Sequence, residues 1–341
     1  MTIANGQSPL DDFRTLATAP APDHSEALVA AHARESHLAK PPGSLGRLEE
    51  IVEWLAVVTG RAPPEVRNPR IVIFAAANGV AQEGVSAYPA DVNPLMLEAF
   101  RANKAAINQL CTAASVGLSV FDLAVTVPSG NIRKEDAFAS EKELAGTLAF
   151  GLEATANGVD LLGLGEMGIA NTTVAAALFA ALFGGTGTDW AGPGTGVTGD
   201  ALSHKAAVVD DALTRVSGTT DPLVLLQRLG GREVAAMTGA ILAARSQAIP
   251  VVIDGFVATA AAAVVHTIEP KAIEHCLFAH RSAEPAHGRA LAAMGAEPLL
   301  DLRMRLGEGS GAAVALPIIR AAALTHSGMA TLGELGAAHP S

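Results

Sequence analysis

Aromatic side chains, cysteines and basic residues are all scarce in this chain of 341 residues. Only 4% of the residues are aromatic, and the two cysteines are Cys111 and Cys276. Two cysteines cannot build a disulfide framework or a four-cysteine zinc site, and such low usage is typical of a reducing compartment. The 34 acidic residues against 23 basic ones give a net charge of −11. This balance argues against a nucleic-acid partner and an anionic membrane surface, because both require a basic face.

Long apolar runs and a leader segment are also missing. The most apolar stretches, 174–183 and 256–265, have about half of the ~20 residues that a membrane span needs. The N-terminus carries Asp11, Asp12 and several prolines, and it lacks the basic-then-apolar pattern of a signal peptide. We therefore expect a cytoplasmic protein with no membrane partner.

Half of the residues are hydrophobic, and the mean hydropathy is +0.33. A chain of this length and composition can bury a large core, which argues against disorder. Because aromatic residues are few and glycines number 34, we expect a core of Ala, Val, Leu and Ile between closely spaced backbones.

Short apolar runs alternate with Ala-rich helical segments after a proline-containing linker at 61–69. This alternation predicts an α/β fold with an open, parallel, Rossmann-like sheet flanked by helices. The site of such a fold lies at the carboxyl ends of its strands. The five predicted strands are 71–75, 118–122, 159–163, 251–254 and 276–280.

Two glycine-rich segments have the composition of anion-binding loops. In 162–173 the glycines allow a strand to turn sharply into a helix, with Asn171, Thr172 or Thr173 as cap, and a helix start favours an anion. The segment 191–196, followed by Lys205, offers backbone amides and a point charge to a phosphate. The alternatives are an ordinary strand-to-helix turn and a flexible loop with a solvated lysine. The glycine spacings match neither the P-loop nor the dinucleotide fingerprint.

A third segment, 306–311, places Glu308 between two glycines. Glycine neighbours leave room for a flat ligand against the carboxylate, and burial would raise its pKa toward that of a useful general base. The alternative is an acidic turn before a helix. The loop 83–89 holds the single tyrosine, Tyr88, and forms either an aromatic-ligand wall or a packed loop. The histidines form no metal-binding pattern such as HExxH, so no metal is expected.

Three motifs together resemble the nicotinate-nucleotide:dimethylbenzimidazole phosphoribosyltransferases, which build the lower nucleotide loop of cobalamin. They are Lys-Pro-Pro-Gly-Ser-Leu-Gly-Arg-Leu-Glu at 40–49, Gly-Glu-Met-Gly-Ile-Ala-Asn-Thr-Thr at 165–173 and Leu-Gly-Glu-Gly-Ser-Gly-Ala-Ala at 306–313. The segments 83–89 and 194–205 follow the family order, and the resemblance spans about 35–325. The chain departs from the family pattern at 77–79, at Ala170, and at Asn93-Pro94-Leu95, where the family has a glutamine in the base pocket.

The resemblance implies a reaction and a set of site residues. Nicotinate mononucleotide and 5,6-dimethylbenzimidazole would give α-ribazole 5′-phosphate and nicotinate, with inversion at the anomeric carbon and with no cofactor or metal. The implied catalytic residues are Glu308, as general base, and Glu166. The implied phosphate and ribose ligands are Gly168, Asn171, Thr172, Gly194, Thr195, Gly196 and Lys205. The implied base-pocket residues are Ser86, Tyr88 and Leu306.

The resemblance also implies a homodimer and a small helical domain built from both chain ends. With the linker at 61–69, it predicts a large α/β domain at 68–295 and a small helical domain at 1–67 plus 296–341. Two other functions stay open at this point: a protein that binds a nucleotide or an azole without catalysis, and another transferase of N-glycosides. A carboxylate placed at the azole favours the transferase over the binder.

Overall fold

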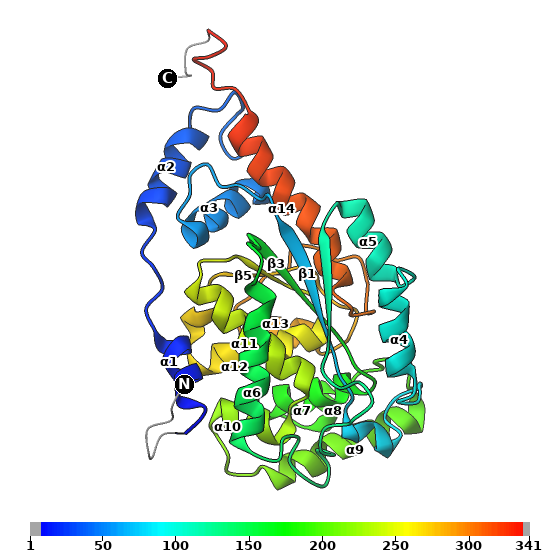
Figure 1. The fold of residues 1–341 in the computed structure, drawn as a ribbon. Helices are drawn as coiled ribbons and strands as arrows, with labels where there is room; N and C mark the ends of the chain where they lie inside the picture. Colours follow the sequence, from blue (N-terminus) through cyan, green and yellow to red (C-terminus); the bar gives the residue numbers. More distant parts are fainter. Residues whose placement is uncertain (1–7, 337–341) are drawn as a thin grey trace.

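Five parallel strands form one sheet with helices on both faces (Figure 1). The computed structural model describes residues 8–336, so the ends of the predicted small domain, 1–7 and 337–341, lie outside the described residues. The strand order is β2-β1-β3-β4-β5. The strands are β1 (Pro69–Ala75), β2 (Gly117–Asp122), β3 (Leu161–Met167), β4 (Val251–Ile253) and β5 (Cys276–Phe278). The predicted α/β class, parallel sheet and five strands are confirmed.

Helices connect the strands and cover the sheet. The α-helices of the described part are α1 (Asp11–Thr18), α2 (Ser25–Glu35), α3 (Arg47–Thr59), α4 (Val92–Arg101), α5 (Ala106–Ala114), α6 (Glu141–Gly151), α7 (Asn171–Phe183), α8 (Gly187–Trp190), α9 (Gly199–Arg215), α10 (Pro222–Leu229), α11 (Arg232–Ser246), α12 (Phe256–Ile268), α13 (His287–Ala293) and α14 (Ser310–Gly328). Short 3-10 helices are η1 (Gly79–Glu83), η2 (Leu152–Thr155) and η3 (Pro270–Ile273). In residues 8–336, no helix has both the length and the hydropathy that crossing a membrane requires.

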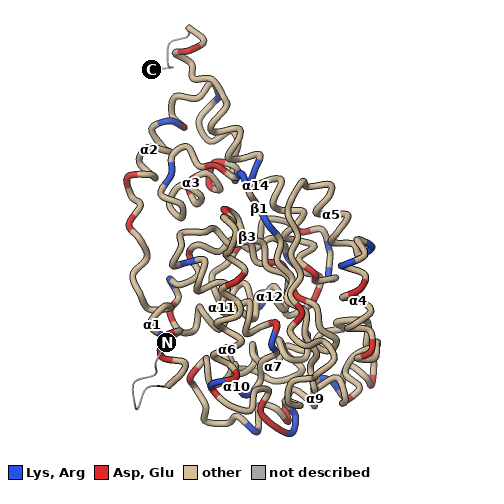
Figure 2. Tube along the Cα trace, viewed as in Figure 1, with Lys and Arg blue, Asp and Glu red and all other residues tan. Residues whose placement is uncertain are grey.

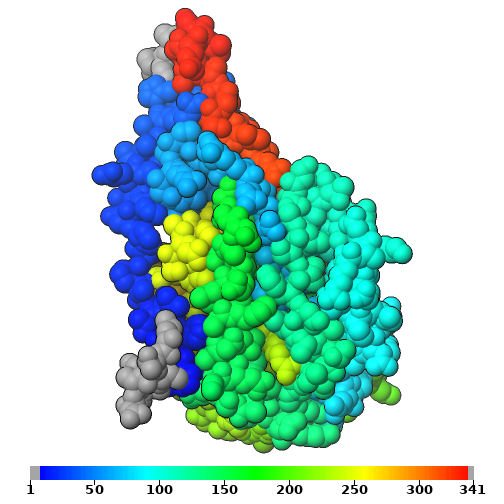
Figure 3. All heavy atoms as spheres, viewed as in Figure 1, coloured from blue at the N-terminus to red at the C-terminus, as the bar shows by residue number. Residues whose placement is uncertain are grey.

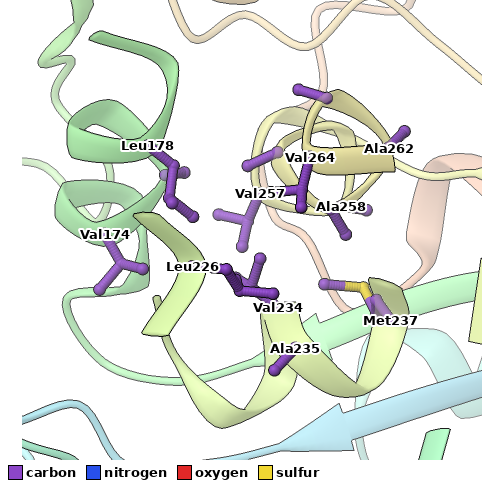
Figure 4. Packing of buried hydrophobic residues seen from close by; sticks show 14 of the residues in the cluster. Val174, Leu178, Leu226, Val234, Ala235, Met237, Val257, Ala258, Ala262 and Val264 are labelled. Carbon is purple, nitrogen blue, oxygen red and sulfur yellow. The ribbon is translucent and has the colours of Figure 1, made fainter. Parts of the chain in front are cut away.

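Alternate residues of each strand point to opposite faces of the sheet, and this divides the core in two. On β1, Val72 and Phe74 pack against one layer of helices, while Ile71 and Ile73 pack against the other. The first layer contains α1, α6, α7, α10, α11 and α12, and Figure 4 shows side chains of α7, α10, α11 and α12 pointing toward one another. The second layer contains α2, α3, α4, α5 and α14.

The N-terminal helices and the last helix meet at one end of the molecule. The blue and red segments lie side by side there in Figures 1 and 3. Arg34 of α2 fixes the contact, because its guanidinium donates hydrogen bonds to the carbonyls of His326 and Ser327 at the end of α14. Helix α1 instead packs against α11 and α12. The division into domains at 68 and 295 stays a prediction.

Strand β3 runs further than its sequence predicts. The predicted strand ended at Gly163, and the expectation that the chain turns sharply directly after it is wrong, because Gly165 still lies inside the strand. A Cβ on Gly165 would overlap the backbone of Gly309, so this glycine lets the loop before α14 lie directly on the strand. The expected side-chain cap is also wrong. Helix α7 follows Ala170, which has a φ of 71° and makes no capping hydrogen bond.

Charged residues of both signs are interspersed along the chain (Figure 2). In that view, basic residues do not gather on one part of the tube.

The crossing of α6 and α11 provides a test of the core packing. A Cβ on Gly239 would overlap the carbonyl oxygen of Leu148, so the two backbones touch at this point. Gly239→Ala should lower the free energy of unfolding by about 1–3 kcal/mol, because overpacking forces the helices apart. The matched control is Gly146→Ala on α6, where a Cβ meets no atom within 4 Å. It should raise stability by about 0.4–1 kcal/mol. Urea unfolding measures both, and stabilisation by both substitutions would contradict the packing described here.

Candidate active site

A cavity of about 730 Å³ opens where the loops that follow β3, β4 and β5 meet. Its position agrees with the rule that sites of open parallel sheets lie at the carboxyl ends of the strands. Nine of the predicted residues line it: Glu166, Gly168, Asn171, Thr172, Gly194, Thr195, Tyr88, Leu306 and Glu308. Ser86, Gly196 and Lys205 do not line it. The fold therefore brings most of the candidate residues into one place.

Glu308 occupies an unusual turn at the wall of this cavity. Gly307, Glu308 and Gly309 all have left-handed backbones, with φ of 82°, 62° and 73°. Glycine adopts this conformation freely, whereas a residue with a Cβ is destabilised by about 1–2 kcal/mol. A Cβ on Gly307 would overlap the carboxylate of Glu166, and the amide of Glu308 donates to the carbonyl of Glu166 at 3.1 Å. The glycines on both sides are thus required by the close packing of this turn on β3.

The carboxylate of Glu308 is buried, and its Oε2 has no hydrogen-bond partner. Burial raises its pKa to about 7, because a charged carboxylate loses hydration there. The expectation that burial would raise this pKa is confirmed in direction. At neutral pH this group can accept a proton and hold it.

Glu166 lies beside this turn near the end of β3. Its Oε2 accepts a hydrogen bond from the side-chain amide of Asn171. Burial raises the pKa of Glu166 to about 8, and the charges of Asp254 and Glu233 act in the same direction. Glu166 therefore holds a proton more tightly than an exposed glutamate does.

Asp254, which directly follows β4, was not among the predicted site residues. Its side chain is 1% exposed and accepts hydrogen bonds from the amides of Gly309 at 3.1 Å and Ala312 at 3.0 Å. Burial raises its pKa to about 7. His280, after β5, has its Nε2 3.8 Å from Asp254 Oδ1. Asp254 and His280 are the last residues of two predicted strands. The rule that sites lie at the carboxyl ends of parallel strands could therefore have identified both from the sequence.

Lys205 is neither solvated nor exposed to the cavity. It is 1% exposed, and its Nζ donates to Thr172 Oγ1 and to the carbonyl of Gly192, both at 2.8 Å. Burial lowers its pKa to about 8. The alternative of a solvated lysine is wrong, because Lys205 fastens the loop 191–196 to the start of α7. Glu284 holds the same loop by accepting from the amide of Gly194 at 2.9 Å.

Arg305 is the one lysine or arginine of the described chain that lines the cavity. Its Nη1 donates to the carbonyl of Gly194 at 2.6 Å, next to the first turn of α7 and the loop 191–196. The other charged groups of the lining are the carboxyls of Glu166, Glu284 and Glu308. A positive side chain and a helix N-terminus therefore meet at one end of an otherwise acidic cavity.

Apolar side chains line much of the rest of the cavity: Tyr88, Val92, Met96, Ile169, Phe256 and Leu306. Ser86 does not line the cavity, and its Oγ lies 2.9 Å from Thr195 Oγ1.

The segment Asn93-Pro94-Leu95, where the chain departs from the family pattern, has a clear structural effect. Asn93 is buried and accepts from the amide of Ile169 at 2.9 Å, whereas Leu95 is 67% exposed and does not line the cavity. Among residues 8–336, no group of three or more His, Cys, Asp or Glu side chains could hold a metal ion.

Known proteins match the chain over nearly its whole length. The family model described as "Phosphoribosyltransferase" matches residues 20–336. Nicotinate-nucleotide–dimethylbenzimidazole phosphoribosyltransferases of Rhizobium etli (strain CIAT 652) and Brucella anthropi (strain ATCC 49188) are 55% and 54% identical, over 96% of this chain and 97% of each relative. The crystal structure of CobT from Thermus thermophilus superposes with a TM-score of 0.88 at 38% identity, over 92% of this chain and 100% of that one. The chain belongs to the nicotinate-nucleotide–dimethylbenzimidazole phosphoribosyltransferase family.

Proposed function

We propose that this chain transfers the phosphoribosyl group of nicotinate mononucleotide to 5,6-dimethylbenzimidazole, with Glu308 as the general base. The two substrates and the transfer are those printed in the names of its 55% identical relatives. The observation that carries the assignment of the base is the buried Glu308, whose Oε2 has no partner and whose side chain lines the cavity. The cavity volume of about 730 Å³ lies within the range of small-molecule sites.

The chemistry requires one base and no acid. The bond between the anomeric carbon and the pyridinium nitrogen breaks, and nicotinate leaves with that electron pair without being protonated. An azole nitrogen attacks the opposite face through an oxocarbenium-like state, so the β-nucleotide becomes an α-ribazole. The second azole nitrogen then loses its proton to the carboxylate of Glu308. Such general-base help contributes ~10²–10⁴-fold, and alignment of the two substrates contributes more.

Glu166 is the second carboxyl group of the proposed site, and we expect it to have a different role from Glu308. Its pKa of about 8 lies above the pKa of about 7 of Glu308. We assign the proton-accepting role to Glu308 because its Oε2 is unpaired, whereas Glu166 Oε2 already accepts a hydrogen bond from Asn171. Two neighbouring carboxyls with separated pKa values can take separate roles.

The phosphate occupies the end of the cavity with the helix N-terminus and Arg305. The proposed ligands are Gly168, Asn171, Thr172, Gly194 and Thr195, all of which line the cavity. Gly196, expected among them from the sequence, does not line it. Lys205 supports them from behind by holding Thr172 and Gly192, and Arg305 supplies the direct positive charge. The azole lies against Tyr88 and Leu306, and Ser86 fixes the tyrosine loop through Thr195.

A homodimer and a cytoplasmic location stay part of this proposal. Tyr88 and Leu306 both line the cavity, and each has more than half of its surface exposed. Apolar side chains gathered in this way are typical of a surface that another protein covers. A second copy of the chain is the partner we propose.

Glu308→Gln tests the base directly. The substitution preserves shape but cannot accept the azole proton, so turnover should fall by ~10²–10⁴-fold while both substrates still bind. In the wild type, kcat should rise as pH increases through about 7, because the active form of Glu308 is ionised, and this rise should disappear in the variant. Nicotinate release measures both effects. Glu50→Gln, a carboxylate 72% exposed on α3, serves as the control. Near-normal turnover in folded Glu308→Gln protein would refute the assignment.

Arg305→Ala tests where the phosphate binds. A hydrogen bond to a charged group is worth about 1.5–3 kcal/mol, so KM for nicotinate mononucleotide should rise about ten- to hundredfold. Nicotinate riboside lacks the phosphate, and its use should change little. Arg303→Ala, an exposed arginine that does not line the cavity, is the matched control. An equal loss with both substrates would show instead that Arg305 acts through its hydrogen bond to Gly194.

A further inference from the structure

The turn that carries Glu308 needs support from outside itself. A glutamate with a φ of 62° between two glycines is held by little within its own sequence, because glycines allow many backbone conformations. The carboxylate must nevertheless keep one place against a small, rigid azole, since a misplacement of about 1 Å can reduce a rate by about 10²-fold. Some neighbouring group must therefore fix the turn.

We propose that Asp254 is the positioning residue that fixes the Gly307-Glu308-Gly309 turn and so presents Glu308 to the azole, an inference that rests on the proposed role of Glu308. One carboxylate oxygen of Asp254 accepts from the amide of Gly309 at 3.1 Å, and the other accepts from the amide of Ala312 at 3.0 Å. On the opposite side, the amide of Glu308 donates to the carbonyl of Glu166. The turn is thus clamped between β4 and β3.

Asp254 is not an ordinary helix cap. The residue at the N-cap of α14 is Gly309, which has no side chain, so no local group caps the helix. Asp254 comes from another strand, is 1% exposed and reaches both the turn and the first turn of the helix. The amide donors and the helix dipole favour the ionised carboxylate and so oppose part of the rise in pKa that burial causes. The same bonds therefore stabilise the helix start and set the place of Glu308.

The charge of Asp254 also acts on its neighbours. The titratable and charged groups around the turn are Glu166 from β3, Glu308 itself, His280 after β5, and Glu284 and Arg305 at the cavity. The charge of Glu308 raises the pKa of Asp254. Because repulsion between like charges is mutual, an ionised Asp254 would in turn disfavour ionisation of Glu308. Loss of this charge should lower the pKa of Glu308. A residue that only stabilised the helix would not change that pKa.

Asp254→Asn tests the proposal. Asparagine can accept from one amide but presents N–H to the other, so the clamp on the turn opens. We expect kcat to fall about ten- to hundredfold, KM for nicotinate mononucleotide to stay within about twofold, and the acidic limb of the kcat–pH profile to move to lower pH. An unchanged kcat, or a parallel loss in kcat and KM without a shifted limb, would overturn the proposal.

The control is Ser310→Ala, which removes a buried hydroxyl next to the turn that has no hydrogen-bond partner and does not line the cavity. It should keep the wild-type kcat and pH profile. If Asp254→Asn does not fold, amide hydrogen exchange of the wild-type protein tests the proposal instead. Slow exchange of the Gly309 amide supports its hydrogen bond to Asp254, and fast exchange contradicts it. Glu308→Gln measured alongside separates the two ideas. Normal turnover of Glu308→Gln would reject the role of Glu308 as general base. Reduced turnover of Glu308→Gln together with normal turnover of Asp254→Asn would reject only the positioning role of Asp254.

Discussion

The close approach of the loop before α14 to strand β3 is the constraint on which the site depends. Gly165 leaves the space for it, since a Cβ there would overlap the backbone of Gly309. Because the loop lies so deep, Glu308 is buried and its pKa rises to about 7. A bulkier strand would push the loop outward, and the carboxylate would regain both its hydration and its ordinary proton affinity.

The same packing separates two chemical environments within one cavity. Glu166 and Glu308 meet beneath the turn, where burial favours the protonated forms. Arg305 and the start of α7 lie at the loop 191–196, where an anion is stabilised. A substrate with a phosphate at one end and a cationic ring at the other has a suitable environment for each. In the proposed reaction, this arrangement orients the nucleotide before the bond to nicotinate breaks.

The parts predicted correctly from sequence are those set by local pattern. Apolar runs identified all five strands, and a carboxylate between glycines identified Glu308, because both depend on neighbouring residues. The role of Gly165 was misjudged, since it makes room for a loop roughly 140 residues later in the chain. Lys205 faces inward and Asp254 reaches Gly309 for the same kind of reason. Contacts between segments far apart in the chain produce no recurring residue pattern, so they could not be predicted from the sequence.

The central claim is that Glu308 receives the proton of the attacking azole. A crystal structure of the enzyme with 5,6-dimethylbenzimidazole bound tests it most directly. The account predicts that an azole nitrogen lies about 2.6–3.2 Å from a carboxylate oxygen of Glu308, with the ring against Tyr88 and Leu306. An azole whose nitrogens both face solvent or Glu166, with Glu308 out of hydrogen-bond reach, would contradict it.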